Sequence, residues 1–315
     1  MKISGFSFVR NGLKLYYPVV ESIKSILPIC DEFVIAVGQG DEDDNTRKAI
    51  EEVGDPKIKI IDTIWEEKYF SRGIINSIQT DVAKNNCSGD WLFYLQADEV
   101  VHEKYLETIY NRCLQLVDRS EVEGLLFRYK HFWGDYSHYH QGHGWYPNEI
   151  RIIRNLPQIH SWQSAQSFRY FDYYDNPRQQ TGHRKLSVAK VDAEIYHYGW
   201  VRPPHLMQNK RRALDSVHWG KKKAIEFYNN VPNEFDYGPL SLLGVFSESH
   251  PKVMENKIQK FDWSDKLQLT GKPNKYRLKH KHETLFYRII SFIENKFCNG
   301  KKFGEFKNYN LLRDI

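Results

Sequence analysis

Short apolar runs alternate with helical periodicity over the first hundred residues, and this alternation limits the fold more than any other feature of the sequence. Runs rich in β-branched and aromatic residues predict strands over 2–9, 32–37, 57–61 and 90–95. Apolar residues at helical spacing predict helices between these strands, over 13–27, 45–53 and 72–86. Strands separated by single helices are typical of βαβ units, so we expect an α/β fold built on a parallel sheet.

The pattern changes after residue 100. A helix is predicted over 102–118 and a strand over 122–132, and a loop-rich region with many aromatic and histidine residues follows to about 185. Beyond it the sequence predicts a strand over 186–196, a helix over 203–228 and an amphipathic helix over 283–297.

Composition excludes several classes of protein. Apolar residues make up 41% of the 315 residues and charged residues 27%, which excludes a disordered chain. No apolar run approaches the ~20 residues that span a bilayer, and the opening MKISGFSFVRNG lacks the long apolar core of a secretory signal. Four cysteines without a CxxC pair are typical of reduced thiols, so we expect a cytoplasmic protein.

Polar residues follow three of the predicted strands. Arg10-Asn11 follows the first, Gln39 and an acidic loop follow the second, and Gln96-Ala97-Asp98-Glu99 follows the fourth. The carboxyl ends of parallel strands meet at one edge, where ligands of α/β sheets bind, so we expect a cleft there. The sequence has no GxGxxG and no P-loop motif, so phosphates in such a cleft need another partner, usually a divalent metal held by carboxylates.

Asp98-Glu99 supplies such carboxylates. They directly follow an apolar strand, where burying an ionised carboxylate costs free energy unless a partner such as a metal ion compensates its charge. The alternative is that one of them caps the helix that begins near residue 102. His197 lies in a second candidate segment, EIYHYGW, where it is either a ligand or a hydrogen-bonded core histidine. The aromatic segment 131–149 suits stacking on sugars or bases, and equally an irregular core. Its histidines have only a loose metal-like spacing, which disfavours zinc.

These motifs resemble the family 2 glycosyltransferases, and in particular their bacterial lipopolysaccharide and capsule branch. The resemblance runs from residue 2 to about 200. It is carried by FSFVRNG, VGQGDEDDNT, FSRGIINSI, GDWLFYLQADEVV, IRIIRNLPQIHSW and IYHYGW, which begin at residues 6, 37, 70, 89, 150 and 195.

The resemblance implies a GT-A type, Rossmann-like α/β fold. Its sheet is expected to be mixed but mainly parallel and flanked by helices, with an aromatic-rich acceptor region and a helical C-terminal extension. It divides the chain into a nucleotide-sugar-binding half over 1–120, an acceptor and catalytic half over 121–230, and a basic C-terminal extension over 231–315.

The implied activity is transfer of a sugar from a nucleotide-sugar to an acceptor hydroxyl, in surface polysaccharide or lipopolysaccharide synthesis. The implied cofactor is a divalent metal, Mn²⁺ or Mg²⁺, held by Asp98 and by His197. The predicted nucleotide-sugar-binding residues are Val9, Arg10, Asn11, Gln39, Asp44, Arg72, Asn76, Gln96, Ala97 and Asp98.

Two positions depart from the family pattern. Gln96 stands where the family has the first Asp of its D-x-D motif, which removes one charge from a metal site. Gln166 stands where a Glu general base is expected, and an amide cannot be a base. Glu149 and Asp135 are the nearest carboxylates in the aromatic segment, and we predict that one of them is the base.

Alternatives remain at this point. The chain could glycosylate protein or nucleic acid, or it could bind a nucleotide or sugar without catalysis. The expected partners are a nucleotide-sugar and a saccharide or lipid-linked acceptor. Residues 271–315 hold 11 Lys/Arg against 4 Asp/Glu, around the apolar stripe of 283–297. We expect this stripe to pack on the catalytic domain, and peripheral contact with the inner face of a membrane is the alternative.

Overall fold

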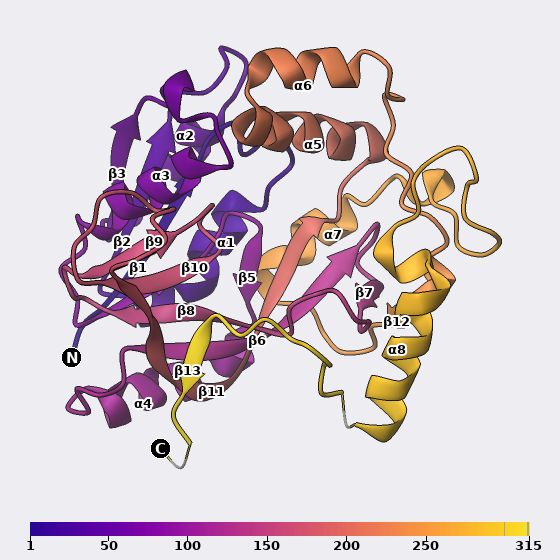
Figure 1. Cartoon of the computed structure of the whole chain (residues 1–315). Coiled ribbons are helices and arrows are strands. Elements are labelled where there is room, and N and C mark those ends of the chain that lie inside the picture. Colours follow the sequence, from indigo (N-terminus) through magenta and orange to yellow (C-terminus); the bar gives the residue numbers. More distant parts are fainter. Residues whose placement is uncertain (299, 314) are drawn as a thin grey trace.

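A single mixed sheet forms the centre of the computed structural model, which describes residues 1–298, 300–313 and 315 (Figure 1). Along the main path of the sheet the strands are β3 (Ile58–Thr63), β2 (Glu32–Gly38), β1 (Ile3–Val9), β4 (Trp91–Tyr94), β8 (Asn148–Arg154), β6 (Gly124–Trp133), β11 (His183–Trp200), β10 (Ser167–Phe171) and β9 (Ile159–Trp162). Shorter strands pair beside this path: β5 (Glu99–Val101), β7 (His138–His140), β12 (Gly244–Val245) and β13 (Tyr309–Leu311).

The first part of the sheet confirms the predicted βαβ pattern. β3, β2, β1 and β4 are parallel neighbours, and α1 (Val19–Ile26), α2 (Thr46–Glu51) and α3 (Ile74–Lys84) connect them. The first helix begins later than the predicted residue 13. A turn occupies that stretch, in which the Leu15 amide bonds to the Asn11 carbonyl and Tyr16 has a positive φ.

The expectation of a mainly parallel sheet was wrong. Among the described residues antiparallel pairings outnumber parallel ones by seven to five. The cause lies in the region predicted as loops, which contains β7, β8, β9 and β10. The connections from β6 to β7 and from β9 to β10 are too short for the crossover that joins parallel strands, and these consecutive strands pair antiparallel.

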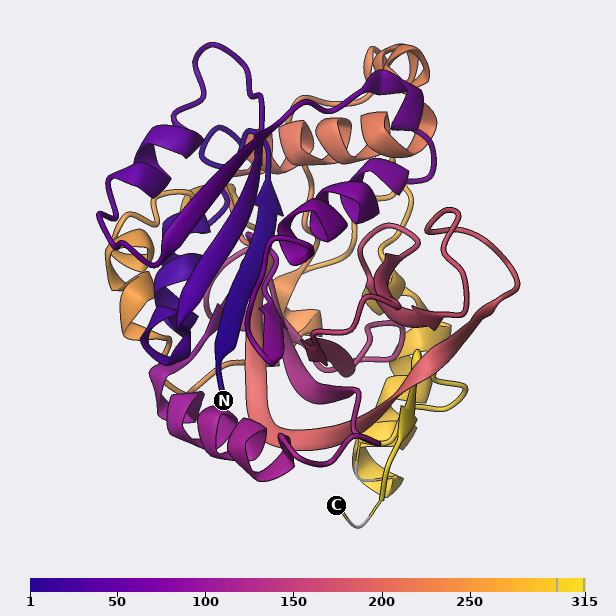
Figure 2. The same ribbon diagram turned by 90° about the vertical axis from the view of Figure 1, so that its left-hand side faces the viewer.

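β11 is the longest of the described strands, with 18 residues, and Figure 2 shows that it bends sharply between its two halves. Its first half pairs with β10 and β13, and its second half pairs with β5 and β6. The pairing with β6 shifts register between Lys190 and Glu194, which is typical of a β-bulge and bends the strand. This bend carries the end of β11 to the carboxyl end of β4.

The sheet is covered on both faces, which explains why every residue of β2 is buried. Side chains alternate along the strands: Phe33 and Ile35 join one core cluster, and Val34 and Ala36 join the other. α1 and α4 (Leu106–Leu116) pack on the first cluster, and α3 contributes Ala83 to the second.

The predicted helix over 203–228 is two helices, α5 (Pro204–Trp219) and α6 (Lys221–Tyr228). Gly220, with φ of 88°, separates them. The remaining helices are α7 (Glu255–Gln259) and α8 (Leu285–Phe297), and short 3₁₀ helices lie at Leu27–Ile29, Glu67–Tyr69, Glu103–Tyr105, Leu240–Leu242, Lys252–Met254, Ser264–Lys266 and Lys281–Glu283. Within the described residues, no helix combines the length and the apolar character needed to cross a membrane.

Candidate active site

A cleft of about 310 Å³ opens at the carboxyl ends of β1 and β4. The last residues of β11 and the inner side of α5 complete its walls. Eight of the predicted site residues line it: Val9, Arg10, Asn11, Asn76, Gln96, Ala97, Asp98 and His197. The residues that line it without having been predicted include Trp65, Ser164, Trp200 and Lys210.

Three of the predicted nucleotide-sugar-binding residues lie outside this cleft. Gln39 and Asp44 line a neighbouring hollow after β2. The two hollows are linked, because Arg10 Nε donates to the Gln39 carbonyl at 2.8 Å. Arg72 is exposed and has a positive φ of 51° at the start of α3.

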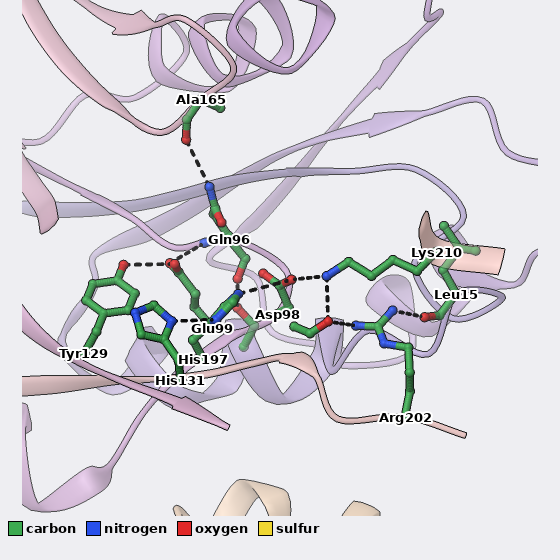
Figure 3. Close-up of polar contacts among 12 residues, drawn as sticks. Leu15, Gln96, Asp98, Glu99, Tyr129, His131, Ala165, His197, Arg202 and Lys210 are labelled. Atoms are coloured by element: carbon green, nitrogen blue, oxygen red, sulfur yellow. Dashed lines mark hydrogen bonds and ion pairs between the residues drawn. The ribbon is translucent and has the colours of Figure 1, made fainter. Parts of the chain in front are cut away.

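Asp98 is buried at the cleft and faces two nitrogen groups (Figure 3). Its Oδ2 lies 3.1 Å from Lys210 Nζ and 3.6 Å from His197 Nε2. Burial opposes ionisation of the Asp98 carboxyl, but Lys210 and His197 outweigh it and hold the pKa of Asp98 below its ordinary value. Asp98 does not cap the next helix, because His102 is that cap: its ring accepts from the Lys104 amide at 3.2 Å.

Glu99 has a different role, because it belongs to a buried ion pair behind the cleft. Arg151 on β8 holds its two carboxylate oxygens with two bonds of 2.8 Å. Tyr129 donates a further bond of 2.9 Å, and the Gln96 amide donates one of 3.1 Å. Glu99 therefore fixes the loop that carries Gln96 and Asp98, and its charge is matched by Arg151.

A chain of hydrogen bonds fixes the ring of His197. His131 Nε2 lies 2.8 Å from the Tyr146 carbonyl, which only accepts, so this nitrogen carries a proton. Burial and the neighbouring His197 hold the pKa of His131 well below its ordinary value, so His131 is neutral and its Nδ1 accepts. His197 Nδ1 lies 3.0 Å from that atom and must donate to it. Nε2 is then the His197 atom that faces Asp98: in the protonated ring it donates toward the carboxylate, and in the neutral ring its lone pair is available to a metal ion.

Lys210 is the site residue that sequence reasoning missed. It lies within α5, and its Nζ bonds the Gly199 carbonyl at 2.7 Å in addition to Asp98. Burial lowers the pKa of Lys210 to about 8, against the opposing effect of Asp98. Arg202 lies beside it, fully buried, and its guanidinium bonds the carbonyls of Leu15 and Gly199. The side chains of Lys210 and Arg202 are therefore two cations at the cleft wall that contains the Asp98 carboxylate.

The two predicted bases lie outside the cleft. Glu149 is buried on β8, and its Oε1 accepts from Ser167 Oγ at 2.7 Å and from the Ile150 amide at 2.9 Å. Burial raises the pKa of Glu149 above its ordinary value. Asp135 accepts from the amides of Ser137 and His138 at 2.9 and 2.8 Å.

Gln166 belongs to the loop between β9 and β10. Two residues of this loop, Gln163 and Ala165, have positive φ angles of 58° and 57°. The Ala165 carbonyl accepts a 3.0 Å bond from Gln96 Nε2, and Ser164 lines the cleft. The loop is therefore held at the cleft by Gln96, the residue that replaces the expected Asp.

The aromatic segment 131–149 mostly belongs to the core. Trp133 is buried and stacks on Trp200, with ring centroids 4.6 Å apart, and only Trp200 of this pair reaches the cleft. The three histidines of the segment have separate surroundings, since His138 faces Asp135, His143 faces Glu294, and His140 is stacked on Trp145.

Asp98 and His197 fit a divalent metal only as part of its ligand set. Their facing atoms are a carboxylate oxygen and an imidazole nitrogen 3.6 Å apart, and of these the oxygen is the kind of ligand that Mn²⁺ and Mg²⁺ prefer. No group of three His, Cys, Asp or Glu suited to a metal occurs in the part of the chain that the structure describes. An ion here would need oxygens from its substrate and from water, and it would share Asp98 with Lys210.

No family model matches the sequence, and no curated protein matches it. Among solved structures, S. aureus TarS 1–349 is similar at 14% identity and a TM-score of 0.37, over 69% of this chain and 65% of that one. The same protein in complex with UDP-GlcNAc gives 15% identity and 0.38, over 73% and 72%. Glucosyl-3-phosphoglycerate synthase from Mycobacterium tuberculosis, in complex with Mn²⁺, UDP and phosphoglyceric acid, gives 14% and 0.29, over 41% and 43%.

Proposed function

We propose that this chain is a glycosyltransferase that moves a sugar from a nucleotide-sugar to an acceptor hydroxyl. The observation that carries the proposal is the cleft, where Asp98, Nε2 of His197 and the Lys210 ammonium converge at the carboxyl ends of β1 and β4. A diphosphate is an anion with many acceptor oxygens, and this wall supplies cationic and metal-binding groups for it.

In this proposal the loops after β1 and β2 bind the nucleoside, and the segment after β4, which contains Gln96 and Asp98, binds the diphosphate. Asp98 and His197 would hold a divalent ion, which would neutralise negative charge on the departing nucleoside diphosphate. Lys210 adds a fixed positive charge beside the same oxygens. The nucleotide-sugar residues proposed are Val9, Arg10, Asn11, Gln39, Asp44, Arg72, Asn76, Gln96, Ala97 and Asp98.

The acceptor side is proposed to come from 121–230, and the nucleotide side from 1–120. The acceptor is a saccharide or a lipid-linked glycan of surface polysaccharide or lipopolysaccharide synthesis, reached at the cytoplasmic face of a membrane. Glu149 or Asp135 is the proposed general base. Glu149 already accepts a bond from Ser167 of β10, and Asp135 already accepts bonds within its own turn, so a catalytic role requires that substrate binding bring either one to the acceptor.

A thermal-shift screen tests the donor. The full chain is titrated with UDP, GDP, CDP and dTDP and with their sugar conjugates, each with Mn²⁺, with Mg²⁺ and with EDTA. A nucleotide at one hundred times its Kd stabilises the folded chain by about 2.7 kcal/mol, which is a readily measured shift. A shift for one nucleotide class supports the proposal, and no shift with any of them contradicts it.

Turnover of an isotope-labelled donor then tests catalysis. Transfer to a saccharide acceptor, or slow hydrolysis to free sugar, is expected of a glycosyltransferase. Nucleotide binding without turnover of any donor indicates a binding module instead. Transfer to protein or to nucleic acid indicates the other class of acceptor, and binding to nucleic acid would weaken steeply with salt.

A further inference from the structure

The apolar side of α8 faces outward. Its large apolar residues recur three or four positions apart and are mostly exposed: Leu285 69%, Phe286 65%, Ile289 51%, Phe292 58%, Ile293 37% and Phe297 70%. Figure 1 shows this helix at the outer edge of the molecule, beside the short strands β7 and β12. The expectation that this stripe packs on the catalytic domain was therefore wrong.

The polar side of α8 is the side that packs. Glu294 is the one buried residue of this fully described helix. Its Oε1 lies 2.7 Å from His143 Nδ1 and 2.7 Å from the Phe303 amide, and Lys302 Nζ lies 3.4 Å from Oε2. Ser291 Oγ accepts a bond of 2.7 Å from the His143 amide. Rotation of the helix to bury its apolar side would remove these partners, so polar contacts hold the apolar side outward.

The charge around this apolar face is positive. Within 271–315 the exposed cations on α8 or next to it in the sequence are Lys279, Lys281, Arg288, Lys296 and Lys301. Two of the carboxylates described in the same segment are buried in ion pairs, Glu283 with Arg277 and Glu294 with His143 and Lys302. The third, Glu305, is half-buried. Among the described residues of 271–315, the exposed charge is thus almost entirely cationic.

We propose that the exposed face of α8 binds flat on an anionic lipid bilayer. Aromatic and aliphatic side chains on one side of a helix enter the boundary between headgroups and acyl chains, and flanking Lys and Arg attract anionic headgroups. A second copy of the chain fits this surface less well, because it would bring two cationic rims together. The inference deepens the proposed function, on which its biological meaning rests, since a lipid-linked acceptor lies in such a bilayer.

Sedimentation with vesicles tests the inference on the full chain. Vesicles of phosphatidylglycerol with phosphatidylcholine are compared with phosphatidylcholine alone, at low and at high salt. The chain is expected to sediment with the anionic vesicles, and high salt is expected to release most of it because salt screens exposed charges. Failure to sediment with anionic vesicles at low salt overturns the proposal, and so does equal binding to both vesicle types.

Point variants locate the surface without removing any structure. The variant Phe286→Gln/Ile289→Gln/Phe292→Gln changes exposed residues of α8. Its matched control is Trp219→Gln/Ile225→Gln/Phe227→Gln, which changes two aromatic residues and one isoleucine, also exposed, next to the cationic start of α6. We expect the α8 variant to lose vesicle binding and the control to keep it. Wild-type binding by the α8 variant, or equal loss in both, overturns the assignment to α8.

Charge variants test the electrostatic part. Arg288→Gln/Lys296→Gln is expected to weaken binding to anionic vesicles by about fivefold for each cation removed. The control Lys222→Gln/Lys223→Gln, also exposed, should bind as the wild type does. An unchanged affinity in the α8 charge variant would contradict a role for the cationic rim.

Two further measurements separate the other outcomes. A dimer in light scattering that the α8 apolar variant dissociates, with no vesicle binding by the wild type, would make a second copy the occupant and overturn the proposal. Nucleotide thermal shift on the same samples separates the two proposals. Vesicle binding without any nucleotide shift supports the lipid face and contradicts the proposed function, and the reverse result contradicts the lipid face alone.

Discussion

Asp98 and Lys210 form a buried ion pair at the cleft, so the substitution of one residue changes both stability and chemistry. A buried charge that loses its partner is costly, whereas replacing both charges by neutral groups is often close to neutral. Variants of the single residue and of the pair therefore separate a structural role of Asp98 from a chemical one.

Asp98→Asn is expected to lower turnover by about 10²-fold or more, because a charged group at the departing diphosphate is lost. It should also lower the free energy of unfolding by about 3 kcal/mol, because Lys210 loses its partner. The double variant Asp98→Asn/Lys210→Met is expected to recover most of this stability and none of the turnover. Denaturant unfolding and labelled-donor turnover measure the two effects, and full turnover in Asp98→Asn would contradict the assigned role.

His131→Asn tests whether His131 positions the lone pair of His197. Loss of a group that orients a metal-binding histidine typically weakens metal affinity about 10–100-fold. We expect a loss of this size for Mn²⁺ in calorimetric titration of the UDP-saturated chain, and unchanged UDP affinity in EDTA. The control His138→Asn, whose ring faces Asp135 outside the cleft, should leave the Mn²⁺ affinity unchanged. Equal losses in Mn²⁺ and metal-free UDP affinity would give His131 a structural role only.

Glu149→Gln and Asp135→Asn decide between the two predicted bases. Loss of a general base typically costs ~10²–10⁴-fold in rate, so one variant is expected to lower kcat by this order while donor affinity is retained. Tm measured on both variants shows whether a lost rate reflects lost structure, since both side chains accept structural hydrogen bonds. If kcat stays normal in both, neither residue is the base.

The sequence predicted Asp98 because an acid directly after an apolar strand is a local signal. It did not predict Lys210, because one lysine in a helix looks like any exposed lysine until the fold buries it. The sequence did not predict the role of His131 either, because its hydrogen bond to His197 joins residues 66 positions apart.

At the scale of elements, α8 depends on one buried carboxylate. Burial opposes ionisation of Glu294, but the Phe303 amide and His143 outweigh it and lower its pKa below the ordinary value. A carboxyl group with a lowered pKa in the folded chain adds stability above its unfolded pKa of about 4.3, and this stability is lost as pH falls through the folded value.

Glu294→Gln is therefore expected to destabilise the chain at pH 7, by about 1.5–3 kcal/mol for bonds to a charged group. The difference in Tm from the wild type should shrink as the pH falls below about 4. Scanning calorimetry over a pH series measures it, with Glu305→Gln, a half-buried residue of the same segment, as the control. A difference in Tm that does not depend on pH would mean that the Glu294 charge does not anchor α8.

The spacing of apolar residues along the sequence located most helices and strands, but it did not locate the boundary between two adjacent elements. Gly220 has a positive φ and ends α5, but the helical pattern of 203–228 continues through it, because apolar periodicity does not reveal the dihedral angles of a glycine. β7, β9 and β10 fell in the region that was expected to be loop-rich, since they have only three, four and five residues.

At the scale of the whole molecule, the two halves of the sheet differ in how far the sequence determines them. β1 to β4 follow from local βαβ units, so their parallel order was predictable. The order of β8, β6 and β11 rests on pairings between distant segments, which periodicity does not encode. α5 is also far along the sequence from β1 and β4, so the sequence predicted a cleft at their carboxyl ends but not the wall that α5 contributes.

The C-terminal residues belong to this sheet, so their removal should affect the whole fold. β13 pairs in parallel with the first half of β11, with Tyr309 opposite Leu186, and Tyr309 packs into the core cluster that includes Phe6 and Val34. Tyr309→Ala is expected to lower the free energy of unfolding by about 3 kcal/mol, because it leaves a large cavity. Deletion of 306–315 should cost more, since the strand pairing is lost as well.

Denaturant unfolding measures both changes, and Phe306→Ala is the control. Phe306 is 70% exposed, so its substitution should change the free energy of unfolding by no more than about 0.5 kcal/mol. A deletion as stable as the full chain would show that β13 adds nothing to the sheet. If the deletion destabilises as expected, loss of vesicle binding in a truncated chain reflects loss of fold, and only the point variants of α8 report on the lipid face.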